Sequence, residues 1–274
     1  MHKLFIASNQ NFPYSITHDI NRWERSFDFG TKTNFTTYKL EGIMGLRNVK
    51  IKWDFLRAVV KFWDTEDHVL WFKTVELCPT IKEFSAILGY DPGKKSVVVS
   101  CDPKHREILS DALGLSTSIT SSMIEGHMVN LHAIVSKLIN KRTHGMSDNI
   151  QKNFGLALCF MGDFLLCSGR LGFMDARAIG IVRQVKDGDN PTSLILAETF
   201  LEMDYVFLGR ESQQFLGSPL TLQIWLTERL DMIATPTVAN YGPSNFLSRT
   251  VLKIECQTES NWVKFLNKKS NVST

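Results

Sequence analysis

The sequence predicts a mainly α-helical fold, a compact multi-helix domain with one or two short β-hairpins or strands in its N-terminal half. Apolar residues recur at helical spacing in several segments, of which residues 53–63 are the clearest. Runs typical of strands are few and short. Hydrophobic residues make up 43% and charged residues 22% of the 274, which is ordinary for a folded chain. We expect one domain over residues 1–274; a division into two lobes, 16–114 and 128–266, joined near 115–127, stays open.

The rest of the chain is expected to be organised around residues 53–89. Residues 53–63 predict an amphipathic helix, and the aromatic, β-branched run 69–77 predicts a strand or half a hairpin. Thr80 would cap the next helix, because Glu83 can reach back to the Thr80 amide and close a capping box. Gly89 would end that helix in the left-handed conformation. Its buried face is expected to hold Ile81, Phe84, Ile87 and Leu88.

Short elements are expected on both sides of this unit. An irregular arm is predicted over residues 1–15, with short helices over 16–29 and 35–46. The run 96–101 predicts a strand, and Asp102-Pro103 predicts the start of a helix that runs to about Leu113 and closes at Gly114. Residues 115–126 are rich in Ser, Thr and Gly, which predicts a linker or long loop between lobes.

The C-terminal half is more apolar and predicts longer helices. Residues 154–166 are nearly all apolar but fewer than the roughly 20 needed to span a bilayer, so a buried core helix is expected. Asp163 inside it needs a partner, and the candidates are Arg170, Arg177 and Arg183. The other predicted elements are a helix over 128–141, a loop over 143–147, helices over 175–185 and 192–208 (the latter capped by Thr192 or Ser193), a helix opened by Ser218-Pro219, a strand over 251–254 and a helix over 262–266.

Charge and cysteine content argue against several classes of protein. The net charge is +3 and the pI about 8.5, short of the pI above roughly 9 of a dedicated nucleic-acid module, so nucleic-acid binding is weakly supported. The five cysteines are scattered without a CxxC pair, which indicates a reducing compartment. The first ten residues hold only four consecutive apolar ones, too few for a signal-peptide core. We therefore expect a protein that is not secreted and not in a membrane.

Known chemical motifs are not completed in this sequence. Residues 89–96, GYDPGKKS, lack the glycine spacing of a phosphate-binding loop, so a helix end followed by a turn is favoured. Cys167 lacks a nucleophile elbow. Cys78 has no paired base in its sequence context, although the helix N-terminus that follows it could lower its thiol pKa. A metal site is not expected either, because the spacing expected of ligands is missing from His105, His127, His132 and His144.

Several blocks of the sequence resemble a known family. This resemblance is to the plant mobile domain, also called aminotransferase-like, and rests on FWD at 62–64, an aromatic strand and ELCPTIKEF at 76–84 in that order. The sequence is most similar to the uncharacterised plant branch of that family, which has FWD and ELxPTxEE blocks. Later blocks at 172–176, 190–199 and 217–228 are similar in order and spacing. The likeness covers about residues 53–231 in pieces. The residues that carry it are Phe62, Trp63, Asp64, Phe72, Glu76, Leu77, Pro79, Thr80, Glu83, Gly89, Asn190, Pro191, Ala197, Glu198 and Trp225.

The resemblance implies a protein of the nucleus that is transposon-associated or domesticated and acts in gene silencing or genome stability; a cytoplasmic location stays open. The label "aminotransferase-like" does not fit the residues. A pyridoxal-phosphate enzyme needs alternating strands and helices and a phosphate cup beside a lysine, and neither is present in the sequence. Asp64, Glu76 and Glu198 would form an acid–base pair only if they met in space, and ion pairs or caps are favoured. We expect no catalytic residue, no cofactor and no metal.

These observations predict a non-enzymatic protein-interaction domain. Its working surface would be an exposed apolar or aromatic patch beside residues 53–89. Two alternatives stay open. One is an enzyme of unrecognised type with a pocket between the lobes, and the other is a weak nucleic-acid-binding domain.

Overall fold

The computed structural model confirms a mainly α-helical fold with two small antiparallel sheets. It describes residues 38–40, 42, 46, 49–73, 75–100, 104–139, 146–168, 170, 172–209, 217–233 and 258–268. The helices in these ranges are α4 (Trp53–Val60), α5 (Ile81–Leu88), α6 (His105–Leu113), α7 (Thr117–Ser122), α8 (Leu131–Ile139), α9 (Met146–Phe160), the π-helix η2 (Met161–Leu165), α10 (Ala178–Lys186), α11 (Thr192–Phe207), α12 (Pro219–Arg229) and α13 (Glu259–Leu266). The arm and helices predicted over 1–37, most of the helix predicted over 35–46 and the strand predicted over 251–254 lie outside the described residues.

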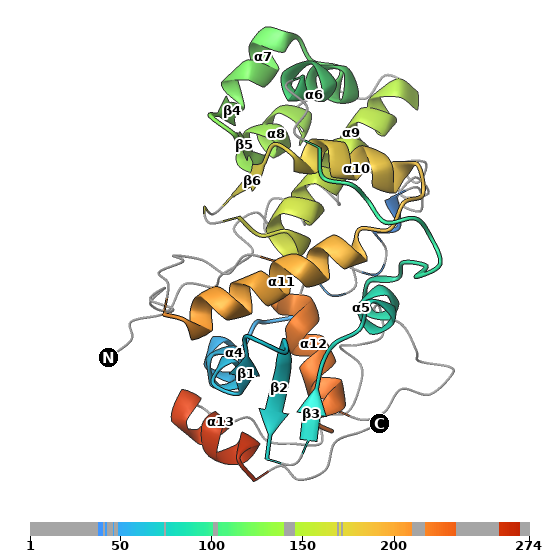
Figure 1. Cartoon of the computed structure of the whole chain (residues 1–274). Helices are drawn as coiled ribbons and strands as arrows, with labels where there is room; N and C mark the ends of the chain where they lie inside the picture. The colour runs from blue at the N-terminus through green and yellow to red at the C-terminus, as the bar shows by residue number, and fades with distance from the viewer. Residues whose placement is uncertain are drawn as a thin grey trace.

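Two groups of elements lie on either side of α11, which crosses the middle of the molecule (Figure 1). One group contains α4, the first sheet, α12 and α13, with α5 packed on both α11 and α12. The other contains α6 to α10 and the second sheet. Helix α6 contacts α7, α9 and α10. The grouping by packing therefore differs from the predicted lobes, which placed residues 105–113 with the first half of the chain.

The first sheet has the order β1 (Trp63–Asp64), β2 (Val69–Phe72), β3 (Val75–Leu77), so the run predicted as a strand or half a hairpin is a complete hairpin. The second sheet has the order β4 (Ile124–Glu125), β5 (Met128–Asn130), β6 (Phe173–Asp175). Its third strand comes from the second half of the chain. Because Val129 pairs with Met174 across these strands, the helices predicted to start at 128 and 175 begin later, at Leu131 and Ala178.

Two other segments differ from the prediction. Residues 115–126 hold α7 and β4 in place of a linker, because Thr120 is buried and its hydroxyl bonds back to the Ser116 carbonyl at 3.3 Å. The strand expected over 96–101 is reduced, among its described residues, to one bridge between Ser96 and Asn190. Val98 instead exchanges hydrogen bonds with the Gln184 side chain, at 2.8 and 2.9 Å.

Helix boundaries follow local hydrogen bonding. Helix α4 ends at Val60 and not at Trp63, because Asp64 Oδ1 accepts the amides of Glu66 and Asp67 at 2.8 and 3.1 Å and turns the chain. Helix α6 begins at His105, with Lys104 at its N-cap. Asp102 and Pro103, which were predicted to start it, lie outside the described residues.

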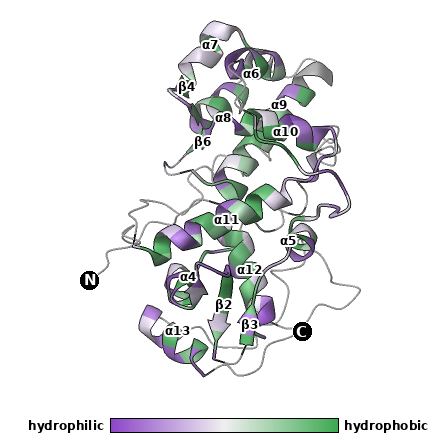
Figure 2. Ribbon diagram, viewed as in Figure 1, coloured by the Kyte–Doolittle hydropathy of each residue, from purple (hydrophilic) through white to green (hydrophobic). Residues whose placement is uncertain are grey.

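Buried helices form the core, as predicted for residues 154–166, but α9 begins earlier, at Met146, within the loop predicted over 143–147. Helix α9 continues into η2, and Phe160, Phe164 and Leu165 are fully buried. In Figure 2, β2 and much of α12 carry the green of hydrophobic residues. Asp163 is 4% exposed. Two of its three predicted partners pair elsewhere, Arg170 with Glu125 and Arg177 with Asp175.

Helix α13, near the end of the chain, packs against α4. The Phe55 and Trp262 rings lie 4.8 Å apart, and Glu259 forms ion pairs with Arg57 and Lys61. Within the described part of the chain, no helix is both long enough and apolar enough to cross a membrane.

Candidate functional site: a junction pocket and the exposed face of α11

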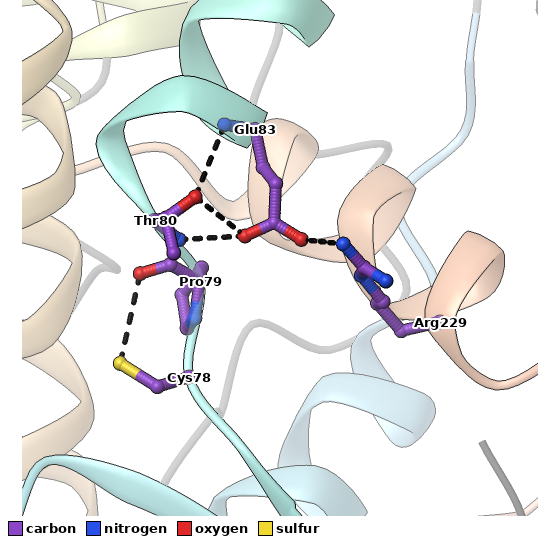
Figure 3. Close-up of polar contacts among 5 residues, drawn as sticks. All are labelled: Cys78, Pro79, Thr80, Glu83 and Arg229. Carbon is purple, nitrogen blue, oxygen red and sulfur yellow. Dashed lines mark hydrogen bonds and ion pairs between the residues drawn. The ribbon is translucent and has the colours of Figure 1, made fainter. Parts of the chain in front are cut away.

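Thr80 and Glu83 form the predicted capping box (Figure 3). Glu83 Oε2 accepts the Thr80 amide at 2.8 Å and its hydroxyl at 2.7 Å, while Thr80 Oγ1 accepts the Glu83 amide at 3.3 Å. The other carboxylate oxygen of Glu83 pairs with Arg229 at the end of α12. Burial disfavours the charged form of Glu83, but the bonds from Thr80 and Arg229 outweigh it, and the pKa of Glu83 lies below its usual value. The motif thus joins α5 to α12.

Cys78 precedes this box, and its environment differs from the prediction. Its thiol faces the Pro79 carbonyl at 3.6 Å (Figure 3). Cys78 is exposed as a residue, but partial desolvation of its thiol raises its pKa, and the charges of Glu83 and Glu76 add to the effect. The net direction is opposite to the lowering that the following helix N-terminus suggested, because burial and the two carboxylates raise the thiol pKa. Cys78 is therefore poorly suited to be a nucleophile.

Trp63 of the FWD motif ties the first sheet to α11. Its indole Nε1 donates to Asp204 Oδ1 at 2.8 Å, and its ring lies 5.2 Å from that of Phe200. His68 adds a contact from Nε2 to Asp204 Oδ2 at 3.2 Å and stacks on Phe200. Asp64 is used by the turn after β1, whose two amides lower its pKa. Trp63 and Asp64 of the motif therefore both make structural hydrogen bonds.

Asn190 joins three segments. Its Nδ2 donates to Ser85 Oγ at 3.2 Å and to the Asp91 carbonyl at 3.0 Å, and its Oδ1 accepts the Thr192 amide at 2.9 Å. Pro191 is the N-cap position of α11 but provides no side-chain cap. Asn190 therefore accepts a backbone amide in the first turn of α11. This is the capping role that was predicted for Thr192 or Ser193.

The remaining motif residues are spread over the fold. The Phe62 and Phe72 rings lie 5.1 Å apart in a tilted arrangement, and Gly89 ends α5 with a φ of 81°, as predicted. Phe72, Pro79 and Trp225 are buried, Leu77 is half-buried, and Glu76 and Ala197 are exposed. Asp64, Glu76 and Glu198 stand on β1, β3 and α11, and no hydrogen bond joins any two of them among the described residues. They do not form the acid–base pair considered from the sequence.

A pocket of about 410 Å³ lies where α11 meets the second group of elements. We call it the junction pocket. Asp175, Glu198 and Gly217 line it, and these three belong to three different blocks of the family-like sequence. Its wall also includes His127, Met128, Leu166, Cys167, Ser168, Arg177, Ala178, Ile181 and Leu194. Sequence reasoning did not bring these residues together, although the shared blocks were the signal that could have done so.

Most polar groups of the junction pocket are already engaged. Arg177 forms a two-pronged pair with Asp175, with both distances 2.8 Å. Burial disfavours the Asp175 carboxylate, but the bonds from Arg177 outweigh it, so the pKa of Asp175 lies below its usual value. Burial, reinforced by the charge of Asp163, raises the pKa of the Cys167 thiol, which donates to the Asp163 carbonyl at 3.2 Å. Cys167 is therefore not an activated thiol, and Asp175 does not have the raised pKa expected of a general acid.

Glu198 differs from these groups and connects the pocket to an exposed helix face. In the described part of the chain it forms no hydrogen bond or ion pair. Leu194, Glu198, Leu201 and Leu208 follow one another at helical spacing, and we call this face of α11 the α11 surface. Leu201 is 49% and Leu208 53% exposed. The junction pocket and the α11 surface therefore adjoin, since Leu194 and Glu198 belong to both.

The comparison with protein families matches the description "Domain of unknown function (DUF7745)" over residues 24–272. The chain belongs to this DUF7745 family. Neither a curated protein nor a solved structure matches it. The DUF7745 match runs from before α4 to beyond α13, so the junction pocket and the α11 surface both lie within the family's domain. Among the described residues of this DUF7745 protein, no group of three or more His, Cys, Asp or Glu side chains is placed to hold a metal ion.

Proposed function

We propose that this DUF7745 domain is a non-catalytic protein-interaction domain of plant mobile domain type, transposon-associated or domesticated, which acts in the nucleus in gene silencing or genome stability. Two lines of support converge. The sequence blocks resemble the plant mobile domain, and the most motif-like polar residues, Thr80, Glu83, Trp63 and Asn190, are engaged in joining helices.

The observation that carries the proposal is the α11 surface. Large apolar side chains exposed on one helix face favour contact with another protein, because burying a leucine contributes about 1.5–3 kcal/mol. The surface lies beside the 53–89 unit, since α11 contacts α4, α5 and β1. A partner that inserts an apolar side chain beside Glu198 would fill the junction pocket at the same time.

The test is co-purification with a double variant, Leu201→Asp with Leu208→Asp, expressed as a tagged protein in plant nuclei. We expect the unaltered protein to retain a stoichiometric protein partner, or a second copy of itself, and the double variant to lose it. Removing two leucines that the partner would bury should cost about 3 kcal/mol or more of binding free energy, which is over a hundredfold in Kd. Quantitative mass spectrometry of the eluate, with light scattering for self-association, measures the outcome.

Ile81→Asp is the matched control, because Ile81 is also large, apolar and 45% exposed but lies on α5. It should keep the partner, and circular dichroism should show both variants folded. A monomeric protein that retains no stoichiometric partner would overturn the proposed function. A partner that survives in the double variant would show that the α11 surface is not the binding face.

A second candidate function, an enzyme of unrecognised type, is favoured by one observation: the junction pocket gathers His127 and the unengaged Glu198 at the junction of the two groups. Incubation of the protein with a plant metabolite extract, followed by NMR, tests it. Turnover that is lost in Glu198→Gln and kept in Glu228→Gln would support an enzyme. Spectra that stay constant over days would remove this candidate.

A further inference from the structure

A second cavity, of about 580 Å³, opens between α6, α9 and α10, away from the α11 surface. Its volume lies within the range of small-molecule sites in proteins. The buried rings of Tyr38 and Phe154 contribute to its wall, 6.4 Å apart and edge to face, together with the side chain of Ile108. We call it the α6–α10 cavity. These apolar side chains share its lining with exposed charged ones.

Four charged side chains at the mouth are exposed and stand without ion pairs. They are Asp111 on α6 and Arg183, Lys186 and Asp187 at the end of α10. In the described part of the chain, none of them lies within ion-pair distance of an opposite charge. Arg183 and Asp187 are four residues apart at the end of one helix, a spacing at which opposite charges commonly pair. Two positive and two negative groups thus surround one opening and remain free for a ligand.

Tyr38 gives an independent indication of a ligand. It is 2% exposed, and its hydroxyl has no hydrogen-bond partner among the described residues. A buried hydroxyl without a partner destabilises the fold, so such groups are uncommon unless something else satisfies them. Burial, and then the charge of Asp187, raise the pKa of Tyr38 to about 12, which keeps the hydroxyl protonated and able to donate at neutral pH.

We propose that the α6–α10 cavity binds a small zwitterion with an apolar body, of the amino-acid type. The ligand carboxylate would lie between Arg183 and Lys186, and its ammonium group near Asp111 and Asp187. The apolar body would contact Phe154 and Ile108, and the Tyr38 hydroxyl would donate to a ligand oxygen. This site is separate from the α11 surface and does not depend on the proposed function.

The mixture of charges selects against ligands of one sign. A phosphate or a nucleic-acid backbone would meet the carboxylates of Asp111 and Asp187, and a simple amine would meet Arg183 and Lys186. A ligand charge placed beside a like charge of the protein weakens binding. A ligand that carries both signs gains from the two positive and the two negative side chains. The expected order of affinity is therefore zwitterion first, with the acid and the amine well behind.

The experiment uses the whole chain and ligand-observed NMR. The twenty standard amino acids are screened at millimolar concentration, and the apolar binders are titrated beside the acid and the amine that lack one charged group, such as 3-phenylpropionate and 2-phenylethylamine for phenylalanine. We expect at least one apolar amino acid to bind tenfold or more tightly than both analogues. Absence of binding by all amino acids, or equal binding by an analogue, would overturn the proposal.

Charge-selectivity variants separate recognition from damage to the fold. Arg183→Gln should weaken binding of the amino acid and of the acid at least tenfold and leave binding of the amine unchanged or tighter. Asp187→Asn should weaken binding of the amino acid and of the amine at least tenfold and leave binding of the acid unchanged or tighter. Arg106→Gln, at an exposed position of α6 outside the cavity, is the matched control and should change nothing. If Arg183→Gln and Asp187→Asn weaken all three ligands alike, the ligand is not held by the proposed charges and the assignment fails.

Discussion

Two sites at opposite ends of the molecule use their polar side chains in opposite ways. At the end built from α4, α5, α12 and the first sheet, Glu83 receives donors from two helices and Trp63 donates to Asp204 at 2.8 Å. Around the α6–α10 cavity, Arg183 and Asp187 share a helix yet remain unpaired within the described residues.

This contrast separates architecture from recognition. A polar group that already has its partners loses more than it gains by turning to a ligand, so it is best understood as a connection between elements. A charged group that stands free at a cavity can gain a partner without breaking one. Substitutions at the first end should therefore change the free energy of unfolding, whereas substitutions at the cavity should change binding and leave stability almost constant.

The largest effect on stability is expected at Asn190, which joins α5, the segment after it and α11. Asn190→Ala removes three hydrogen bonds and leaves Ser85, the Asp91 carbonyl and the Thr192 amide without those partners. Because these groups are buried or partly buried, the free energy of unfolding should fall by about 2–4 kcal/mol. Urea unfolding followed by circular dichroism measures it.

Asn130→Ala is the control for this prediction. Asn130 Oδ1 accepts one amide, that of Ala133, at 3.0 Å and caps α8 alone. Its loss should cost about 1 kcal/mol. If the two variants unfold at the same urea concentration, Asn190 does not join the segments as its contacts indicate.

Glu83 should have a smaller effect that depends on pH. Glu83→Gln weakens the capping box and the pair with Arg229, and should cost about 1–2 kcal/mol at neutral pH. The folded-state pKa of Glu83 lies below its unfolded value of about 4.3. The charged form therefore stabilises the fold above pH 4.3, and this contribution disappears as the pH falls through the lower, folded-state pKa.

Chemical unfolding of Glu83→Gln and the unaltered chain between neutral and acid pH checks this dependence. The difference between the two should shrink below about pH 4. Arg183→Gln provides the comparison from the other end of the molecule, and its effect should stay below about 0.5 kcal/mol at every pH. A constant difference for Glu83, or a loss for Arg183 as large as that for Glu83, would break the distinction between the two ends.

Features set by neighbours in the sequence could be predicted. Thr80 and Glu83 are three residues apart, and a helix that starts at Thr80 necessarily brings them together. Gly89, Gly114 and the pair Ser218-Pro219 also mark helix ends through their own backbone preferences, and the structure confirms all three. These local signals were sufficient for the mainly α-helical fold and for most helix positions.

Features set by distant partners could not be predicted. Met128–Asn130 has the helical spacing of its neighbours but pairs as a strand with Phe173–Asp175. Ile81 was expected to be buried and is exposed, whereas Ser85 is buried because it accepts from Asn190. The junction pocket likewise depends on bringing separate blocks of the sequence onto one wall. No periodicity within a single segment carries that information.

The smallest effect concerns Cys78, where the sequence and the structure predict opposite signs. A helix N-terminus alone would lower the thiol pKa and speed alkylation, but burial and the charges of Glu83 and Glu76 raise it. Since the thiolate is the reactive form, Cys78 should react with iodoacetamide several-fold more slowly at pH 7.5 than a thiol of pKa about 8.5, such as that of a short unstructured peptide. Mass spectrometry of the Cys78 peptide gives the rate.

Glu76→Gln tests the electrostatic part of this effect without disturbing the capping box, because Glu76 is exposed and lies outside it. Removal of its charge should lower the thiol pKa slightly and raise the alkylation rate by up to about twofold at low salt, with less change at high salt. Glu125→Gln, on the second sheet, should leave the rate unchanged. A Cys78 that reacts faster than the peptide thiol would mean that the helix N-terminus dominates after all. Cys78 would then be a reactive thiol, contrary to the direction of its pKa.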